Sequence, residues 1–289
     1  MQINEKKQSE AIILLSIVFK RKINYFVTIK TNLLLICKIK IFIMKKISLF
    51  VSSLILLLGT TQVLAQNADE VINKYIETIG GKQKLEALSS TKMELVANYQ
   101  GMEIPVEVSN SKDGKMLVKI NLMGKEMTQV AFDGVSGWST NMMTMKAEKM
   151  TSEDIENMKN TATRDFPDPF LNYQQKGYKA EYIGKETKEG TDCHKIKLTK
   201  LPQSVNGEKI DDVTFYYFDT ENNVIVMSEA EIKEGPMKGQ MATSKMSNYQ
   251  EVDGIYFPFT MNQFGQEMTV KKITLNSAID SKALEFKAE

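Results

Sequence analysis

Histidine and cysteine are almost absent from this 289-residue chain, which has one histidine, His194, and two cysteines, Cys37 and Cys193. One histidine excludes a two-histidine metal site, and Cys193 with His194 would supply at most two of the four ligands that zinc usually takes. In the strand predicted over 191–198, these adjacent side chains point to opposite faces and cannot form a nucleophile–base pair. We therefore expect no metal site, with Cys193 in the core and His194 an ordinary strand residue.

Local catalytic motifs are also missing. The chain has no Gly-x-Ser-x-Gly elbow, no phosphate-cradling glycine loop and no dinucleotide fingerprint. Carboxylates are plentiful, as at Asp211, Asp212, Glu229 and Glu231, and a fold can assemble an acid/base pair from distant residues. We expect that the protein is not an enzyme, and a secreted hydrolase that uses unrecognised carboxylates is the alternative.

Residues 44–65 have the pattern of a complete secretory signal. Lys45 and Lys46 form the basic start, 47–58 the apolar stretch, and Val-Leu-Ala at 63–65 the cleavage site. The apolar run is short for a bilayer-spanning helix, although a retained membrane anchor is the alternative. We expect a periplasmic product that begins at Gln66. Residues 1–43 are then a mis-assigned or non-structural leader, and 66–289 form one domain.

Removal of the leader changes the charge of the protein. Residues 1–65 hold 10 of the 37 lysines and arginines but only 2 of the 36 aspartates and glutamates, so the remainder has a net charge of −7. Such a chain is a poor candidate for nucleic acid or an anionic membrane surface. Cys193 is then the only cysteine, which excludes an intramolecular disulfide, so the fold must be held by its core.

The spacing of apolar residues predicts helix first and strands afterwards. Residues 69–79 have apolar side chains at helical intervals, Gly80-Gly81 ends that helix, and 82–88 resumes it. From Thr91 the period changes to two, as in half-buried antiparallel strands. Turn signals such as Asp113-Gly114 and Asp253-Gly254 separate the strands. The predicted fold is mainly β, a long antiparallel sheet that is curled or nearly closed.

A helical insertion interrupts this sheet. Ser152, followed by two acidic residues, suits a helix start, and Ile155, Met158 and Ala162 share one apolar stripe. Prolines at 167 and 169 end the helix before the apolar stretch 170–173. Such an insertion can lie across the mouth of a barrel as a lid.

Methionine is unusually frequent. The chain has 18 methionines, and 16 of them lie after position 65. Methionine side chains are flexible and polarizable, so a cavity lined with them can adapt to acyl chains of different length. Simple replacement of leucine in the core is the alternative, and the aromatics are either cavity wall or core. The candidate cavity and lid residues are Met93, Tyr99, Met127, Trp138, Met143, Met145, Ile155, Met158, Phe166 and Phe170.

Four segments carry a resemblance to a known family. They are the helix end at 79–81, the turn Phe-Asp-Gly-Val-Ser-Gly-Trp at 132–138, Asp-Pro-Phe at 168–170, and 249–258 near the C-terminus. Across residues 66–289 the sequence resembles a diverged member of the LolA/LolB-like periplasmic outer-membrane lipoprotein-sorting proteins. These motifs are turns and packing positions, so they specify a fold better than an activity.

That resemblance implies an unclosed antiparallel β-barrel with an N-terminal helix and a helical lid. It also implies a carrier or sensor for the acyl chains of lipoproteins or other lipids, with envelope donor and acceptor proteins as partners, no cofactor and no catalysis. Carriers of the family commonly hold the lid with an arginine on an early strand, whereas the only arginine after position 65 is Arg164, in the expected lid. A secreted protein-interaction module with a packed core is the alternative.

The signal pattern gives the first testable prediction. N-terminal sequencing of the secreted protein should find Gln66, free or cyclised, as the first residue, because the small-residue site ends at Ala65. A mature product that still contains Met1 or residues 2–43 would contradict both the leader assignment and the charge derived from it.

Overall fold

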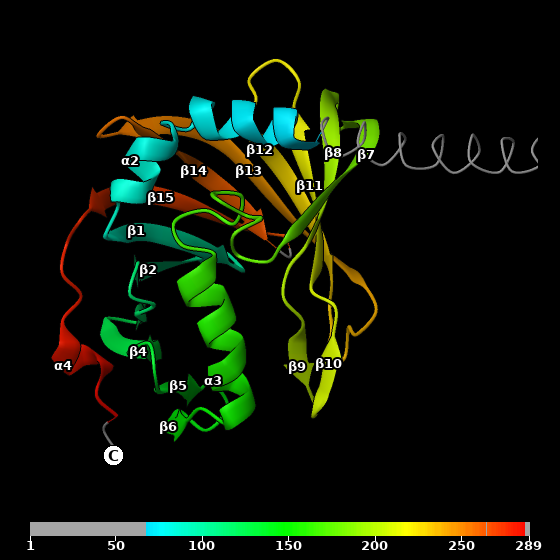
Figure 1. The fold of residues 1–289 in the computed structure, drawn as a ribbon. Helices are drawn as coiled ribbons and strands as arrows, with labels where there is room; N and C mark the ends of the chain where they lie inside the picture. Colours follow the sequence, from blue (N-terminus) through cyan, green and yellow to red (C-terminus); the bar gives the residue numbers. More distant parts are fainter. Residues whose placement is uncertain (1–67, 264, 287–289) are drawn as a thin grey trace, which may run out of the picture. The chain divides into compact units, whose positions relative to one another are not determined.

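A thirteen-stranded antiparallel sheet dominates the computed structural model, which describes residues 68–263 and 265–286 (Figure 1). All of these residues belong to one compact unit of the chain, residues 63–289. The expected leader and signal, 1–43 and 44–65, lie outside the described residues. Within the described ranges, no helix is both long and apolar enough to cross a membrane.

The strands lie in the order β6-β5-β4-β3-β2-β1-β15-β14-β13-β12-β11-β8-β7, and β9 and β10 form a separate hairpin. Their bounds are β1 Ser90–Tyr99, β2 Met102–Ser111, β3 Met116–Leu122, β4 Lys125–Phe132, β5 Gly137–Asn141, β6 Lys146–Lys149, β7 Lys179–Lys188, β8 Thr191–Thr199, β9 Gln203–Val205, β10 Glu208–Ile210, β11 Val213–Asp219, β12 Ile225–Glu231, β13 Met241–Val252, β14 Ile255–Gln263 and β15 Gln266–Leu275. The edge strands β6 and β7 do not pair with each other in the described part of the chain. The predicted mainly β, unclosed antiparallel fold is therefore confirmed.

The first strand of the sheet pairs with the last. Met93 of β1 lies opposite Val108 of β2 on one side and Ile273 of β15 on the other. Strands β6 and β7 follow each other along the chain. Because β1 and β15 are both central in the sheet, however, β6 and β7 stand at its opposite edges. The segment 150–178 connects these two edges, and we call it the lid. It contains α3 (Ser152–Met158) and the π-helix η1 (Lys159–Thr163).

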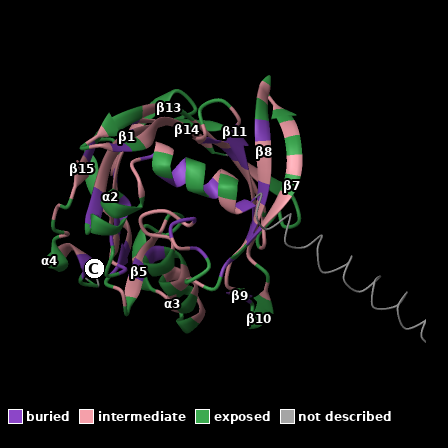
Figure 2. Cartoon of the chain, turned by 45° about the horizontal axis from the view of Figure 1, so that its top comes forward, coloured by how far each residue is buried: buried purple, intermediate pink, exposed green. Residues whose placement is uncertain are grey.

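The sheet has an inner face, covered by helices, and an outer face. Helical residues 68–78, which we call the N-terminal helix, and α2 (Lys82–Ala87) lie on the inner face (Figures 1 and 2). Ile72 and Tyr75 of the helix join Phe170 of the lid and Phe218 of β11 in one buried cluster. Burial of such apolar side chains, about 1.5–3 kcal/mol each, is the main force that holds the helix on the sheet.

The outer face carries a separate apolar cluster. Leu117 and Ala131 are cross-strand partners, and they pack with Trp138 and with Leu284 of α4 (Ser281–Leu284). The Trp138 indole Nε1 donates a hydrogen bond of 3.0 Å to the main-chain oxygen of Leu284. This bond satisfies the buried N–H and ties the C-terminal segment to the sheet.

The turn between the N-terminal helix and α2 requires glycine at position 80. Gly80 has φ +136°, and a Cβ placed there would lie 2.8 Å from the main-chain oxygen of Gly254. Gly101 has φ +81° and nothing within 4 Å of a Cβ position. Backbone conformation is therefore unfavourable for alanine at both positions, but only Gly80 also has a steric clash.

We expect Gly80→Ala to lower the free energy of unfolding by about 1–3 kcal/mol more than Gly101→Ala, measured by denaturant unfolding. The additional loss comes from the clash with the turn between β13 and β14. Equal losses in the two variants would contradict the close contact at Gly80.

Candidate functional site

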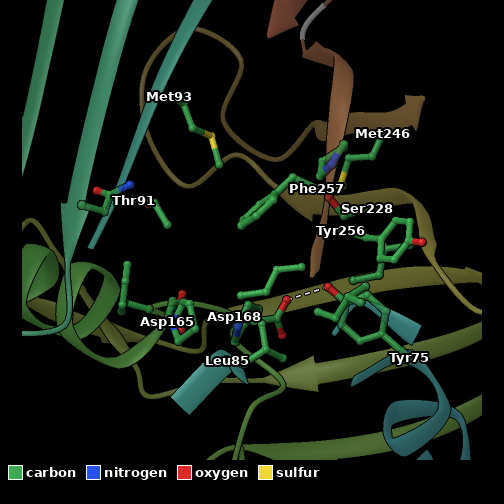
Figure 3. Close-up of a pocket in the computed structure, with 18 of the residues that line it drawn as sticks. Tyr75, Leu85, Thr91, Met93, Asp165, Asp168, Ser228, Met246, Tyr256 and Phe257 are labelled. Carbon is green, nitrogen blue, oxygen red and sulfur yellow. Dashed lines mark hydrogen bonds between the residues drawn. The ribbon is translucent and has the colours of Figure 1, made fainter. Parts of the chain in front are cut away.

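A cavity of about 520 Å³ lies between the inner face of the sheet and the lid (Figure 3). This volume is within the range of roughly 300–1,000 Å³ that is usual for small-molecule sites. Among the described residues, no lysine or arginine lines it. Most lining residues are apolar, namely Ile79, Leu85, Met93, Met116, Ala162, Phe166, Pro167, Pro169, Ile225, Met246, Ile255, Phe257 and Pro258.

The lid begins with a helix that the sequence caps well. The Asp154 amide donates to the Thr151 side-chain oxygen (3.1 Å), and the Thr151 amide donates to the Asp154 carboxylate (2.9 Å). This capping box starts α3 at Ser152, as predicted from the acidic residues that follow it. The helix then widens into η1, which places Thr161 and Ala162 against the cavity.

Hydrogen bonds attach α3 to the β9–β10 hairpin. The Asn157 Nδ2 donates to the main-chain oxygen of Ser204 (2.7 Å), and the Ser204 amide donates to the Asn157 Oδ1 (2.9 Å). The Glu153 carboxylate accepts from the amides of Asn206 (3.0 Å) and Gly207 (2.8 Å). No residue of α3 is fully buried. Such partly exposed polar contacts contribute modestly, which makes α3 a candidate for local opening.

The cavity has one acidic end, where Asp165 and Asp168 of the lid line its wall. The Tyr75 hydroxyl donates to Asp168 Oδ2 over 2.6 Å, and the Phe170 amide donates to Oδ1 over 2.8 Å (Figure 3). Burial raises the pKa of Asp168 above its ordinary value, although these two hydrogen bonds oppose the shift. The carboxylate is therefore held in a site that disfavours its charge.

Asp165 has a different environment from Asp168. Lys200 Nζ lies 2.9 Å from the Asp165 carboxylate and 3.2 Å from that of Asp212. The Tyr178 hydroxyl also donates to Asp165, over 2.8 Å. Burial alone would lower the pKa of Lys200, but the neighbouring Asp165 raises it above its ordinary value. Asp165 is thus neutralised by a lysine that lies behind the cavity wall.

The structure brings together some of the candidate residues. Met93 of β1 and Phe166 of the lid both line the cavity. Phe170 follows Phe166 by four positions in the lid, but it is 1% exposed and packs edge-on against the rings of Tyr75 and Tyr216. Phe170 therefore supports the cavity wall from within the core.

The other candidates lie elsewhere. Tyr99 and two methionines of the β5–β6 turn, Met143 and Met145, are exposed, Met143 at 90%. Met127 is the cross-strand partner of Ile120, outside the lining residues. Trp138 is on the outer face, away from the cavity. In α3, Ile155 and Met158 are partly buried and do not line it.

Several lining residues were not among the candidates. Tyr75 and Ile79 are on the helical stripe that the sequence shows, and Ile225, Ile255 and Phe257 occupy alternating positions of predicted strands. Periodicity predicts a helix or a strand at these positions. It does not separate a cavity wall from a packed core, because both are apolar positions on the same face.

The adjacent cysteine and histidine of β8 lie on opposite faces of the sheet. Cys193 is fully buried on the outer face with Tyr217 and Met227. His194 points to the inner face, where its Nδ1 lies 3.1 Å from the Tyr182 hydroxyl. Their predicted separation on opposite faces of β8 is confirmed. In the described residues, no group of three or more histidine, cysteine, aspartate or glutamate side chains is arranged to hold a metal ion.

No protein-family model and no curated protein matches this chain. Solved structures that are similar to it include a LolA superfamily protein from Nitrosomonas europaea, with 14% identity, a TM-score of 0.48, and 76% of this chain and 97% of that chain covered. Another, described as an outer membrane lipoprotein-sorting protein domain from Vibrio parahaemolyticus, has 12% identity, a TM-score of 0.47 and coverage of 76% and 97%. Both descriptions name the family that the sequence resembles. At this level of similarity, function has to be argued from the cavity and the lid.

The attachment of α3 gives a prediction. Asn157→Ala removes two hydrogen bonds to Ser204, so amide hydrogen exchange in α3 should be about 5- to 30-fold faster. Asn160→Ala is the control, because the Asn160 side chain makes no hydrogen bond to the residues that the structure describes. Equal exchange in the two variants would contradict the role of this contact.

Proposed function

We propose that this protein is a periplasmic carrier or sensor that binds the acyl chains of lipoproteins or other lipids beneath its lid. The observation that carries the proposal is the apolar cavity of about 520 Å³, which has no lysine or arginine among its described lining residues. The secretory pattern of 44–65 supports the location. The protein performs no chemistry in this proposal, since binding and release require only the cavity and a movable cover.

Burial of hydrocarbon supplies the affinity. Each methylene that leaves water contributes about 0.8 kcal/mol. The apolar surface of the inner face also continues beyond the lining residues of the cavity, because Leu95, Val270 and Ile273 form a further buried cluster there, with partly buried neighbours that include Phe259 and Met261. A chain longer than the cavity therefore has apolar surface along which to extend.

Release requires the cavity to open. The α3 end of the lid is attached to the β9–β10 hairpin by the hydrogen bonds of Asn157, Glu153 and Glu156, and these bonds can break without exposing a core residue of α3. An acceptor that binds the open state better than the closed one would shift the equilibrium toward release. In this proposal, the hydrogen bonds of α3 hold the lid closed, as an arginine contact does in the family that the sequence resembles.

A protein-interaction module is the second candidate, and exposed methionines favour it. Met123 is 97% exposed at the β3–β4 turn, and Met143 is 90% exposed at the β5–β6 turn. Flexible thioether side chains are common on surfaces that accept varied partners. Native mass spectrometry of protein purified from its own envelope separates the two candidates, because only a carrier should retain lipid.

The cavity gives a prediction for binding. Phe166→Asp places a charge in the cavity wall, so the Kd of a neutral fluorescent acyl probe should rise at least about 10-fold. Met143→Asp adds the same charge at an exposed position and should leave the Kd unchanged. The midpoint of thermal unfolding should change less than binding does, because Phe166 is only partly buried at the edge of the core.

A second cavity variant covers the case in which Phe166→Asp does not fold. Met246→Trp enlarges an apolar side chain of the cavity wall without adding charge and should also weaken probe binding. Wild-type affinity in both folded variants would contradict the assignment of the cavity as the lipid site.

A further inference from the structure

The Asp168 carboxylate has no cationic partner. Among the described residues, no lysine or arginine side chain forms an ion pair with it. The nearby Lys176 Nζ donates instead to the main-chain oxygen of Asp168, over 2.7 Å. Asp165, the other acidic residue of the lining, is paired with Lys200. Asp165 is therefore already neutralised by a lysine, whereas the Asp168 carboxylate can still accept a cationic partner.

Asp168 also has unused hydrogen-bonding capacity. An ionised carboxylate accepts about four hydrogen bonds. Its described partners are the Tyr75 hydroxyl on Oδ2 and the Phe170 amide on Oδ1. Asp168 itself lines the cavity, so a ligand in the cavity is the group best placed to supply further donors. A buried charge without a partner is costly, so a ligand that supplies one gains affinity from the contact.

The cations around this end of the cavity are already engaged. Lys200 is shared by Asp165 and Asp212, and Lys176 is held by the main-chain oxygen of Asp168. Neither lysine lines the cavity. An anionic head group that entered here would meet Asp168 and Asp165 without a cation in the described lining.

We infer that Asp168 determines which polar group of a lipid the cavity accepts. The favoured ligands are acylated molecules whose polar end is a primary ammonium or another hydrogen-bond donor, and carboxylate or phosphate ends are disfavoured. This inference rests on the proposed lipid-binding function and names its ligand class. Asp168 acts as a specificity-determining residue, while the apolar wall binds the chain of any such lipid.

The test compares ligands of one chain length that differ only in the polar end. Dodecylamine, dodecanol and dodecanoate, each below its critical micelle concentration, displace a neutral fluorescent acyl probe from the full-length secreted protein at pH 7.5. We expect dodecylamine to bind at least 10-fold more tightly than dodecanoate, with dodecanol between them. Asp168→Asn should reduce the preference for amine over carboxylate at least 5-fold while probe binding is retained.

The matched control is Asp253→Asn, which makes the same change of charge at an exposed turn with φ +50°, a conformation that asparagine tolerates. It should leave the ligand order unchanged. Tyr75→Phe covers the case in which Asp168→Asn does not fold, because it frees one more acceptor position and should keep or increase the preference for amine.

The outcomes separate this inference from the proposed function. Equal binding of the three ligands by the wild type, or an unchanged order in Asp168→Asn, overturns the role of Asp168 and leaves lipid binding intact. Loss of the amine preference in Tyr75→Phe overturns it as well. Failure of the wild type to bind the neutral probe overturns the proposed function itself.

Discussion

The pairing of β1 with β15 is the constraint on which the rest of the structure depends. It joins the first and last strands of the sheet, with Met93 opposite Ile273 and Ala97 opposite Met268. Consecutive strands β6 and β7 are consequently at opposite edges, so the intervening segment has to cross between them. Sheets of this many strands curl because each strand twists against the next. The lid is thus a consequence of strand order as much as of its own sequence.

The two covers of the inner face are held by different forces. The N-terminal helix buries apolar side chains such as Ile72 and Ile76 in the main core, so its removal would expose a large apolar area. In contrast, α3 contacts the β9–β10 hairpin through Asn157 and Glu153, and none of its residues is fully buried. This division gives the inner face a fixed cover and, in α3, a cover with a lower cost of opening, which is the arrangement that the proposed carrier requires.

Electrostatics distinguishes this cavity from a simple apolar pocket. Its lining combines hydrocarbon with two carboxylates of the lid, and Lys200 compensates only Asp165. Asp168 depends on Tyr75 and on the Phe170 amide for its hydrogen bonds. Asp168 belongs to the lid, whereas Tyr75, which donates to it, belongs to the N-terminal helix, so the position of the carboxylate depends on the contact between these two segments.

The sequence by itself determined the elements of this fold. Alternation placed Met93 and Leu95 on one face, the capping residues set the start of α3, and strand geometry separated Cys193 from His194. These features depend on neighbours along the chain. The cavity was decided by tertiary structure alone, because strand order and curvature choose which apolar positions face a space and which face a packed core. That is why the exposed Met143 could be distinguished from a cavity residue only in the folded protein.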